Sequence, residues 1–484
     1  MSDLTSFNLV LCAMGDNNNN GPRKLQKAKI LKKHKDGVHP VKHPFKNIGL
    51  SISVLSLSLV LGCTEAVIPE PEKLADKGAL VLVGGALAGS NAAVYQRFIE
   101  LAGGELQARI AVIPAASGQP VKYFKQFQQD MQRYGLDEDQ MTLFQVAVSD
   151  DKNTKDIDES QWRRGATDIK LAEQLSQFTA VWFLGGDQLN ITATLAPDGQ
   201  HSVLLDAIWA LYQRGGVVGG TSAGAAMMSD VMIAAGDSWG ALTAGTTDSY
   251  NGMQDQENGP LMLAKGLGFF PHAIIDQHFD RKARFGRLIV AAELNKATFP
   301  MGFGIDENTA LVYTAHNNSA QVIGAGAVTA IDVSNARRLE NPHGYHIENV
   351  RVSVMQGGDY YHFDTEQFVA NPLKSATVGH EYLNLAKPVV SGVFSRNSRL
   401  KDLLTFDLLD NKGATEVVSY LHQGQGNGFT LRFSQDEYTT GYWQYLDGLL
   451  DSGSAFGVKL DIIPTEFSIT PLPAATATAA VTTE

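Results

Sequence analysis

Short apolar runs alternate with longer amphipathic stretches over residues 79–335. Apolar runs of this length are typical of strands buried on both faces, and amphipathic stretches are typical of helices that cover a sheet. The expected strands are 79–83, 109–113, 142–146, 179–184, 217–219 and 273–276. The expected helices are 91–102, 123–134 and 203–213, and further β-structure is expected at 302–313 and 320–332. The pattern predicts an α/β domain in which a parallel sheet lies between helices on both faces, as three layers.

The pattern changes after residue 335. Short β-patterned pieces at 346–356, 360–363, 428–433 and 457–463 surround a helix-like stretch at 442–450. We expect 336–470 to form a separate accessory region, β-rich or mixed, after the α/β domain at 79–335. The last residues, 471–484, are rich in alanine and threonine and are expected to be disordered.

An apolar run at 48–62 follows Lys42 and Lys46 and ends at Cys63. Its 15 residues are too few to cross a bilayer, which takes about 20. A basic start, an apolar middle and a small-residue end are typical of a secretion signal. The last four residues, Val60-Leu61-Gly62-Cys63, resemble a bacterial lipobox, whose cysteine receives lipid and becomes the mature N-terminus.

The N-terminal part therefore divides into a basic extension at 1–47, a signal with lipobox at 48–63 and a tether at 64–78. The extension fits no signal peptide, so it reflects either a mis-assigned start codon or a real additional segment. We expect an exported protein, anchored to the outer membrane by lipid or released outside the cell. The alternative is that 48–62 is a buried helix of the fold.

Composition and charge narrow the classes of partner. Hydrophobic residues make up 44% and charged residues 19%, as in ordinary globular proteins. Residues 1–46 are basic, so the remainder carries a net charge of about −18. An acidic body argues against nucleic acid and anionic membrane as partners and suits a cationic substrate. A second copy of the chain, as a homodimer, stays open.

The cysteine and histidine positions exclude two kinds of chemistry. The cysteines are Cys12 and Cys63 alone, so a chain beginning at Cys63 has no internal disulfide and no thiol nucleophile in its body. His343 and His346 are close in sequence, but no thiol or carboxylate cluster completes a metal site around them. We therefore expect neither a metal nor a cofactor.

The segment 217–226 has the pattern of a nucleophile elbow, in which a strand reverses sharply into a helix. Gly220 and Gly224 supply the room for that turn, and Ser222 lies at its tip with its Oγ exposed. The backbone N–H of Ala223, at the start of the following helix, can point at a developing oxyanion. This short motif also occurs by chance, so its setting decides its meaning.

A second glycine turn, Gly185-Gly186-Asp187-Gln188, ends the expected strand at 179–184. Ligands bind at the carboxyl ends of the strands in open α/β sheets. A glycine backbone can approach a substrate closely, so the N–H of Gly186 is a candidate second oxyanion donor. The alternative interpretation is that Asp187 caps the next helix.

His278 follows the expected strand at 273–276 and can serve as general base for a serine. A catalytic imidazole needs an acceptor that holds its tautomer, and Glu307 or Asp306, on a turn between apolar pieces, could supply it. The alternatives are a structural histidine and a hairpin with solvated acids. The polar neighbours favour a functional histidine: they are Asp276, Gln277, Arg281, Lys282, Arg284 and Arg287.

Four segments in this order resemble the cyanophycinases, serine exopeptidases related to the aspartyl dipeptidases. The segments are Gly185–Gln188, Gly220–Ala225, Asp276–Phe279 with Arg284 and Arg287, and Gly304–Ala310. The resemblance covers about 79–335 and implies a fold akin to class I glutamine amidotransferases. The implied substrate is cyanophycin, a poly-aspartate backbone with arginine on each β-carboxyl group. The implied product is the β-aspartyl-arginine dipeptide.

The resemblance also implies residue roles. Ser222 matches the nucleophile and His278 the base, whereas the acid is either Glu307 or, in another assignment, Asp237. Further matching positions are expected near the substrate: Gln188, Asp276, Gln277, Arg284 and Arg287. We expect the two arginines to bind carboxylates of the substrate, and Asp187 or Asp276 to bind its guanidinium group. This chain departs from the family at Lys282, where an arginine is usual, and in the loop 84–91, which lacks an acidic residue.

Three competing functions remain open. An α-aspartyl dipeptidase or another small-peptide serine hydrolase would use the same chemistry on a different substrate. An α/β-hydrolase esterase has the chain order serine, acid, histidine, whereas the order favoured here is Ser222, His278, Glu307. A non-catalytic surface lipoprotein would bind the polymer without turnover.

Overall fold

The computed structural model describes residues 78–384, 399–446 and 450–470. The predicted basic extension, signal segment with Cys63, C-terminal tail and nearly all of the tether lie outside the described residues.

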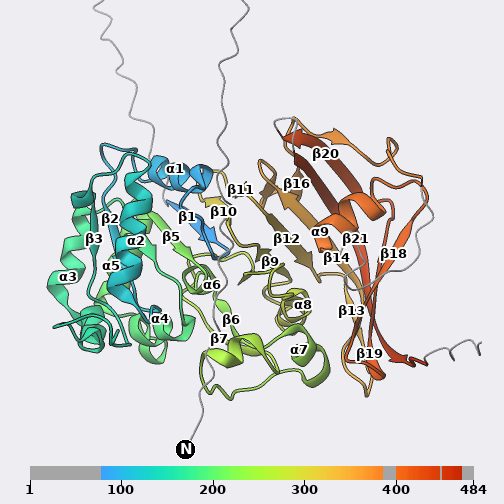
Figure 1. Ribbon diagram of the computed structural model, residues 1–484, viewed down its shortest axis with the longest axis horizontal. Helices are drawn as coiled ribbons and strands as arrows, with labels where there is room; N and C mark the ends of the chain where they lie inside the picture. The colour runs from blue at the N-terminus through green and yellow to red at the C-terminus, as the bar shows by residue number, and fades with distance from the viewer. Residues whose placement is uncertain (1–77, 385–398, 447–449, 471–484) are drawn as a thin grey trace, which may run out of the picture. The chain divides into compact units, whose positions relative to one another are not determined.

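The first sheet has nine strands and is mixed (Figure 1). Its parallel half, in spatial order, is β3 (Met141–Leu143), β2 (Ile110–Ile113), β4 (Ala180–Phe183), β5 (Val217–Thr221) and β1 (Ala79–Val83). Its antiparallel half continues from β1 with β10 (Thr309–Thr314), β11 (Ser319–Gly324), β15 (Tyr360–His362) and β16 (Gln367–Val369). The predicted α/β class is confirmed, and the predicted parallel strands form one half of this sheet. Hairpins, which need no crossover helix, complete the other half.

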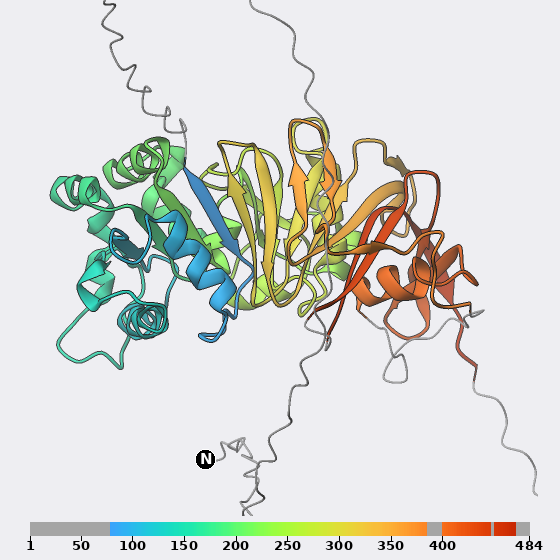
Figure 2. The ribbon, with the colours of Figure 1, turned by 90° about the horizontal axis from the view of Figure 1, so that it is seen from above.

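The alternation of side chains along β1 explains the three layers. Leu80 and Leu82 pack with α5 (Val203–Gln213) on one face. Val81 and Val83 face the other way, because successive side chains of a strand point to opposite faces, and they pack with two further helices. Those helices are α1 (Ala92–Leu101) and α2 (Pro120–Gln132). Figure 2 shows helices above and below these strands.

The remaining helices are short. The α-helices are α3 (Ile169–Gln174), α4 (Gln188–Leu195), α6 (Ala223–Ala226), α7 (Ser238–Ala244), α8 (Phe285–Leu294) and α9 (Leu400–Asp402), the last leading into a π-helix at Leu403–Leu408. The 3-10 helices are Glu138–Gln140, Glu159–Thr167, Leu175–Gln177, Pro197–Gly199 and Met253–Glu257. None of the helices in the described ranges is long and apolar enough to span a membrane.

A second sheet of ten strands follows. Its main path, in spatial order, is β17 (Ser375–Ala376), β20 (Thr440–Leu446), β21 (Leu450–Phe467), β14 (His346–Gln356), β12 (Ala327–Asp332), β9 (Met301–Ile305) and β8 (Ile274–Gln277). β13 (Arg337–Leu339) pairs with β14, and β18 (Glu416–His422) with β19 (Gly426–Ser434), which pairs with β21. A separate pair is formed by β6 (Val231–Ala235) and β7 (Met262–Lys265).

The strands after residue 335 continue both sheets. β14 pairs with β12 along the full length of β12, and β15 adds to β11 of the first sheet. The described residues all belong to one compact unit, Glu70–Glu484. The expected accessory region is therefore not separate where the structure describes it. The helix-like stretch at 442–450 was a wrong prediction, because its aromatic residues lie on β20 and pair with β21.

The second sheet is packed on both faces. On one face Val352 and Ile331 contact α7 and α8 through Leu242 and Leu288. On the other, residues such as Phe303 belong to the core of the first sheet. The ends of β8 and β9 are therefore held against the first sheet by apolar burial, the dominant favourable contribution to folding.

A buried ion pair joins the two sheets. Lys374 Nζ lies 2.8 Å from Asp359 Oδ1, and both side chains are 0% exposed. Asp359 directly precedes β15, and the same Nζ donates to Ser454 Oγ of β21 at 2.7 Å. A buried charge is tolerated only when it is paired in this way.

We expect Lys374→Met to lower the free energy of unfolding by about 3–5 kcal/mol, because it leaves the Asp359 carboxylate buried without its cation. Urea unfolding followed by circular dichroism measures the change. The matched control, Lys412→Met, alters an exposed lysine and should change the stability by less than about 0.5 kcal/mol. Equal stabilities of the two variants would contradict the role of this pair.

Candidate active site

The turn from β5 into α6 has the geometry of a nucleophile elbow. Ser222 has φ 56° and ψ −114°, a conformation that is strained for any residue with a side chain. A Cβ on Gly220 would lie 2.5 Å from the carbonyl oxygen of Gly224, and one on Gly224 would lie 2.6 Å from that of Phe183. Close backbone packing therefore requires both glycines, and it holds Ser222 at the tip of the turn.

Three polar side chains form a hydrogen-bonded chain at this turn. Ser222 Oγ lies 2.9 Å from His278 Nε2, and His278 Nδ1 lies 2.7 Å from Glu307 Oε1. His278 directly follows β8, and Glu307 lies between β9 and β10. The nucleophile candidate thus comes from the first sheet and the base candidate from the second. Hydrogen bonds of these lengths and in this order are those of a serine-histidine-acid triad.

Neighbouring backbone fixes the histidine. The N–H of His278 donates to the carbonyl of Gly84 at 2.7 Å, and its φ is 48°. A Cβ on Gly85 would lie 2.4 Å from His278 Nε2, so the loop after β1 can approach the ring only as glycine. Sequence reasoning did not predict that the loop after β1 contacts the catalytic histidine. The double glycine directly after β1 could have indicated such a close approach.

Burial lowers the pKa of His278, and the hydrogen bond that His278 donates to Glu307 opposes that shift. The charges of Lys282 and Arg284 lower the pKa further. The imidazole is therefore neutral at pH 7 and can accept a proton from Ser222.

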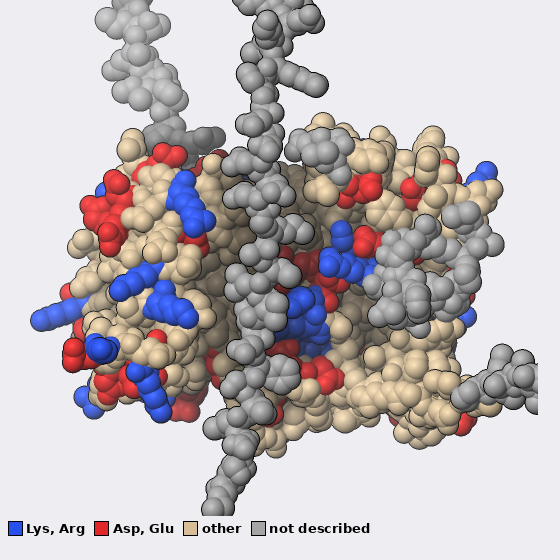
Figure 3. Space-filling model, in the orientation of Figure 1, with Lys and Arg blue, Asp and Glu red and all other residues tan. Residues whose placement is uncertain are grey.

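Figure 3 shows acidic and basic side chains interspersed on one face of the molecule, so the net negative charge is not gathered into a single patch there.

The two alternative acids point elsewhere. Asp237 caps α7 and accepts hydrogen bonds from the backbone N–H groups of Gly240 and Gly259, at 2.6 and 2.9 Å. Asp306 accepts from the N–H groups of Asp280 and Ala327, and burial raises its pKa to about 6. Of the three candidate acids, the structure brings Glu307 to the histidine.

The second glycine turn lies beside the serine. A Cβ on Gly185 would lie 3.2 Å from Ser222 Cβ. Gly186 has φ 143° and fits closely against the carbonyl of Ala116, where a Cβ would lie 1.9 Å from the oxygen. The backbone of this turn and the N–H of Ala223 are therefore both adjacent to Ser222, as two oxyanion donors would have to be.

Four residues expected near the substrate are instead buried and bonded within the protein. Gln188, Asp276, Arg284 and Arg287 are each at most 2% exposed. Arg287 forms a bidentate pair with Asp276, with distances of 2.8 and 2.6 Å. Gln188 donates to the carbonyls of Ile233 and Ala234. The expectation that these side chains bind substrate does not fit this geometry, because a buried charge needs its partner.

Arg284 and Gln277 connect this buried network to the serine. Arg284 donates to the backbone carbonyl of Gln277 at 2.8 Å and lies 3.2 Å from Glu257, and burial lowers the pKa of Arg284 to about 10. Gln277 Oε1 lies 3.4 Å from Ser222 Oγ. Of the expected substrate positions, Gln277 is therefore the one in contact with the serine.

Asp187 caps a helix, as the alternative interpretation of the second glycine turn predicted. It caps α4 by accepting from the N–H of Leu189 at 2.9 Å, and its other oxygen accepts from the Tyr250 hydroxyl at 2.8 Å. Burial, followed by the charge and hydrogen bond of Asp187, raises the pKa of Tyr250. The carboxylate is thus held inside the protein.

Sequence reasoning also missed two pairings at the rim of the site. Arg281 Nε lies 3.9 Å from Glu307 Oε2, and the arginine side chain is 76% exposed. Lys282 pairs with Glu257, which is distant in sequence and belongs to no motif. In the described ranges no group of three or more His, Cys, Asp or Glu side chains is arranged to hold a metal ion.

This chain is similar to several known peptidases. Residues 80–322 match the model of peptidase family S51. A cyanophycinase from Synechococcus elongatus is 30% identical over 299 residues, which cover 60% of this chain and 81% of that protein. A cyanophycinase from Geminocystis herdmanii is 30% identical over 283 residues, covering 57% and 90%. The crystal structure of a peptidase from an acI-B1 actinobacterium is 21% identical, covers 59% of this chain and 97% of that one, and has a TM-score of 0.39. The family match and the curated relatives show that this chain belongs to peptidase family S51, as a cyanophycinase-like serine peptidase.

Proposed function

We propose that this chain hydrolyses cyanophycin to β-aspartyl-arginine dipeptides through an acyl-enzyme. The observation that carries the proposal is the hydrogen-bonded chain Ser222–His278–Glu307 at a strained elbow, in a sequence similar to cyanophycinases. The acidic body of the chain suits a polymer whose side chains carry guanidinium groups.

In the proposed mechanism, Ser222 Oγ attacks the main-chain carbonyl next to a β-aspartyl-arginine unit while His278 Nε2 takes its proton. Glu307 holds the ring with Nδ1 protonated and stabilises the imidazolium. The N–H groups of Ala223 and Gly186 bind the oxyanion, and loss of one such donor typically costs about 2.7–4 kcal/mol. His278 then protonates the leaving amine, and a water molecule activated by the same histidine releases the acyl group.

Substrate contacts have to come from groups that the buried network does not use. We propose that Arg281, exposed beside Glu307, meets a substrate carboxylate, because its guanidinium can bind one in a bidentate manner. Arg284 and Arg287 are buried, and they hold β8 and the 3-10 helix that ends at Glu257. They are positioning residues.

We expect Ser222→Ala to lower kcat on purified cyanophycin by about 10⁴-fold or more, because the nucleophile is lost. Mass analysis of the released dipeptide measures the activity, and an unchanged circular dichroism spectrum shows that the variant folds. The matched control, Ser176→Ala, changes an exposed serine and should retain full activity.

Undiminished dipeptide release by Ser222→Ala would overturn the assignment of the nucleophile. Parallel assays on aspartyl dipeptides distinguish the alternative substrates: activity there, without activity on the polymer, would identify a small-peptide hydrolase. Binding of the polymer by the wild-type protein without any turnover would identify a binding lipoprotein.

The pH profile tests the acid. Activity needs neutral His278, whose pKa is lowered, so the acidic limb of kcat/KM should lie below the ordinary histidine value of about 6.5. Glu307→Gln removes an interaction that raises this pKa, so the limb should move to still lower pH, and kcat should fall by about 10⁴-fold. The control is Asp237→Asn, which should leave the limb in place. A larger loss in Asp237→Asn than in Glu307→Gln would reverse the assignment.

We also propose that the protein is exported and lipid-anchored at Cys63. The support is the apolar run at 48–62 followed by Val60-Leu61-Gly62-Cys63. In a Gram-negative host grown with radiolabelled palmitate, the wild-type protein should take up label and Cys63→Ser should lose it. Cys12→Ser is the matched control and should remain labelled. Equal labelling of the wild type and Cys63→Ser would contradict the anchor.

A further inference from the structure

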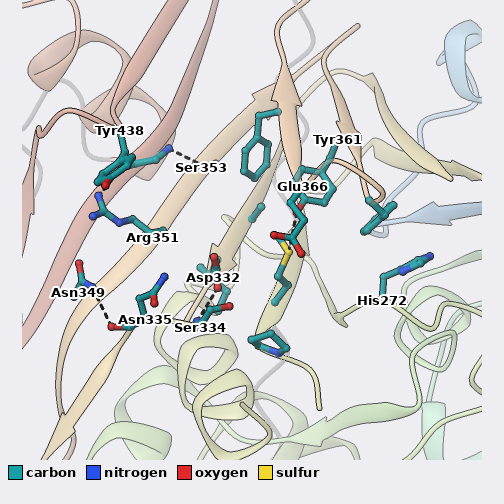
Figure 4. A pocket seen from close by; sticks show the side chains of 17 residues that line it. His272, Asp332, Ser334, Asn335, Asn349, Arg351, Ser353, Tyr361, Glu366 and Tyr438 are labelled. Atoms are coloured by element: carbon teal, nitrogen blue, oxygen red, sulfur yellow. Dashed lines mark hydrogen bonds between the residues drawn. The ribbon is translucent and has the colours of Figure 1, made fainter. Parts of the chain in front are cut away.

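A cavity of about 900 Å³ is lined by residues of both sheets (Figure 4). Its wall includes Met301 at the start of β9 and Asp332 at the end of β12. Glu307 of the triad follows the other end of β9. Since each strand residue advances by about 3.3 Å, the two ends of this five-residue strand are about 13 Å apart. The cavity is therefore distinct from the proposed catalytic site.

Asp332 presents a carboxylate to this cavity that the arginine opposite it does not neutralise. It lies directly opposite Arg351 in the β12–β14 pairing. Arg351, however, pairs with Asp436 at 2.6 Å and lies over the ring of Tyr438. Asp332 instead accepts a hydrogen bond from the backbone N–H of Ser334 at 2.7 Å, and it enters no ion pair within the described part of the chain.

Glu366 presents a second carboxylate from the opposite side. It lies on the turn between β15 and β16, with a φ of 53° that costs backbone strain. Figure 4 shows the Glu366 and Asp332 side chains on either side of the open space. Residues 78–384, 399–446 and 450–470 supply no ion pair to Glu366 either. Two unneutralised carboxylates facing one space make it favourable for a cation.

Aromatic rings form the wall between these carboxylates. The ring centroid of Tyr361 lies 4.9 Å from that of Phe363 and 4.6 Å from that of Phe368, and all three residues line the cavity. Burial, followed by the charges of Glu366 and Asp332, raises the pKa of the Tyr361 hydroxyl. The space thus combines negative potential with aromatic faces, both of which attract cations.

We propose that this cavity is a second binding site that takes the guanidinium group of an arginine unit, held between Asp332 and Glu366 against the aromatic wall. A guanidinium is planar, stacks on aromatic rings and donates hydrogen bonds to more than one carboxylate, whereas an ammonium is a compact, strongly hydrated charge. The identification of the ligand as part of a polymer rests on the proposed function.

The site would act on the polymer and not on its smallest units. Cyanophycin carries one guanidinium per aspartate, so a chain held at the cavity stays close to the protein while its end enters the catalytic site. Such a second contact raises the local concentration of substrate without changing the chemistry. A single dipeptide cannot occupy both sites at once.

Equilibrium binding tests the cavity without turnover. The protein is the full chain with Ser222→Ala, and the probe is Nα-acetyl-L-arginine methylamide, titrated by calorimetry. Adding Asp332→Asn and Glu366→Gln should remove one binding site or weaken it at least 10-fold. The asparagine keeps the oxygen that accepts from Ser334 N–H, so the fold should persist. The uncharged probe Nα-acetyl-L-citrulline methylamide should not bind there.

A matched control changes the same charge elsewhere. Asp139→Asn with Asp198→Asn removes two exposed carboxylates from the first α/β layers and should leave arginine-probe binding unchanged. Equal affinity and stoichiometry in the cavity variant and its parent would overturn the proposal. So would an equal loss of binding in the control variant, because the effect would then be one of net charge alone.

Hydrolysis separates the failure of this site from the failure of the proposed function. In the otherwise wild-type protein, Asp332→Asn with Glu366→Gln should raise KM for cyanophycin about 10-fold, leave kcat unchanged and leave hydrolysis of a short soluble aspartyl-arginine peptide unaffected. Wild-type kinetics on the polymer would overturn the second site while the proposed function stands. No hydrolysis by the wild type would overturn the proposed function, and the binding experiment would still decide on the cavity.

Discussion

The hydrogen bond between Ser222 and His278 connects the ends of two strands that belong to different sheets. β5 is a central strand of the first sheet, and β8 is an edge strand of the second. A distance of 2.9 Å between their two side chains can persist only if the sheets are fixed against each other. The apolar layer between them, to which Phe303 and Leu311 belong, is therefore a condition of the chemistry.

β8 needs contacts from other elements to hold its position, because it has a neighbouring strand on one side only within the described sheet. The bidentate pair of Arg287 with Asp276 supplies part of it, since it ties β8 to α8. Arg284 adds bonds to the Gln277 carbonyl and to Glu257. Burying these charges costs desolvation energy, which the ion pairs and hydrogen bonds of the network offset. These charged groups are buried, so they cannot contact a substrate from solvent. Their role in positioning the histidine explains why the desolvation cost is met.

Local patterns predicted the parallel half of the first sheet and its helices well. The strand 79–83 and the helix 203–213 have the bounds of β1 and α5, because buried strands and amphipathic helices carry their own periodicity. The antiparallel half and the second sheet were less predictable. The partner of a strand in a hairpin is determined by packing. The aromatic residues of β20 were therefore predicted to be helical, although in the structure they pair with β21. The domain boundary at 335 failed for the same reason, since β12 and β14 pair across it.

The sequence by itself determined the candidate nucleophile, base and glycine turns. A strained elbow and a close backbone approach demand particular residue types at adjacent positions, and Gly220, Ser222 and Gly224 are such positions. Only the tertiary structure decided which acid meets the histidine and which charged side chains are exposed beside the triad. Glu307, Asp306 and Asp237 are all carboxylic acids, and Arg284 and Arg281 are both arginines. Their distances and burial depend on contacts between segments far apart in the chain, which no local pattern records.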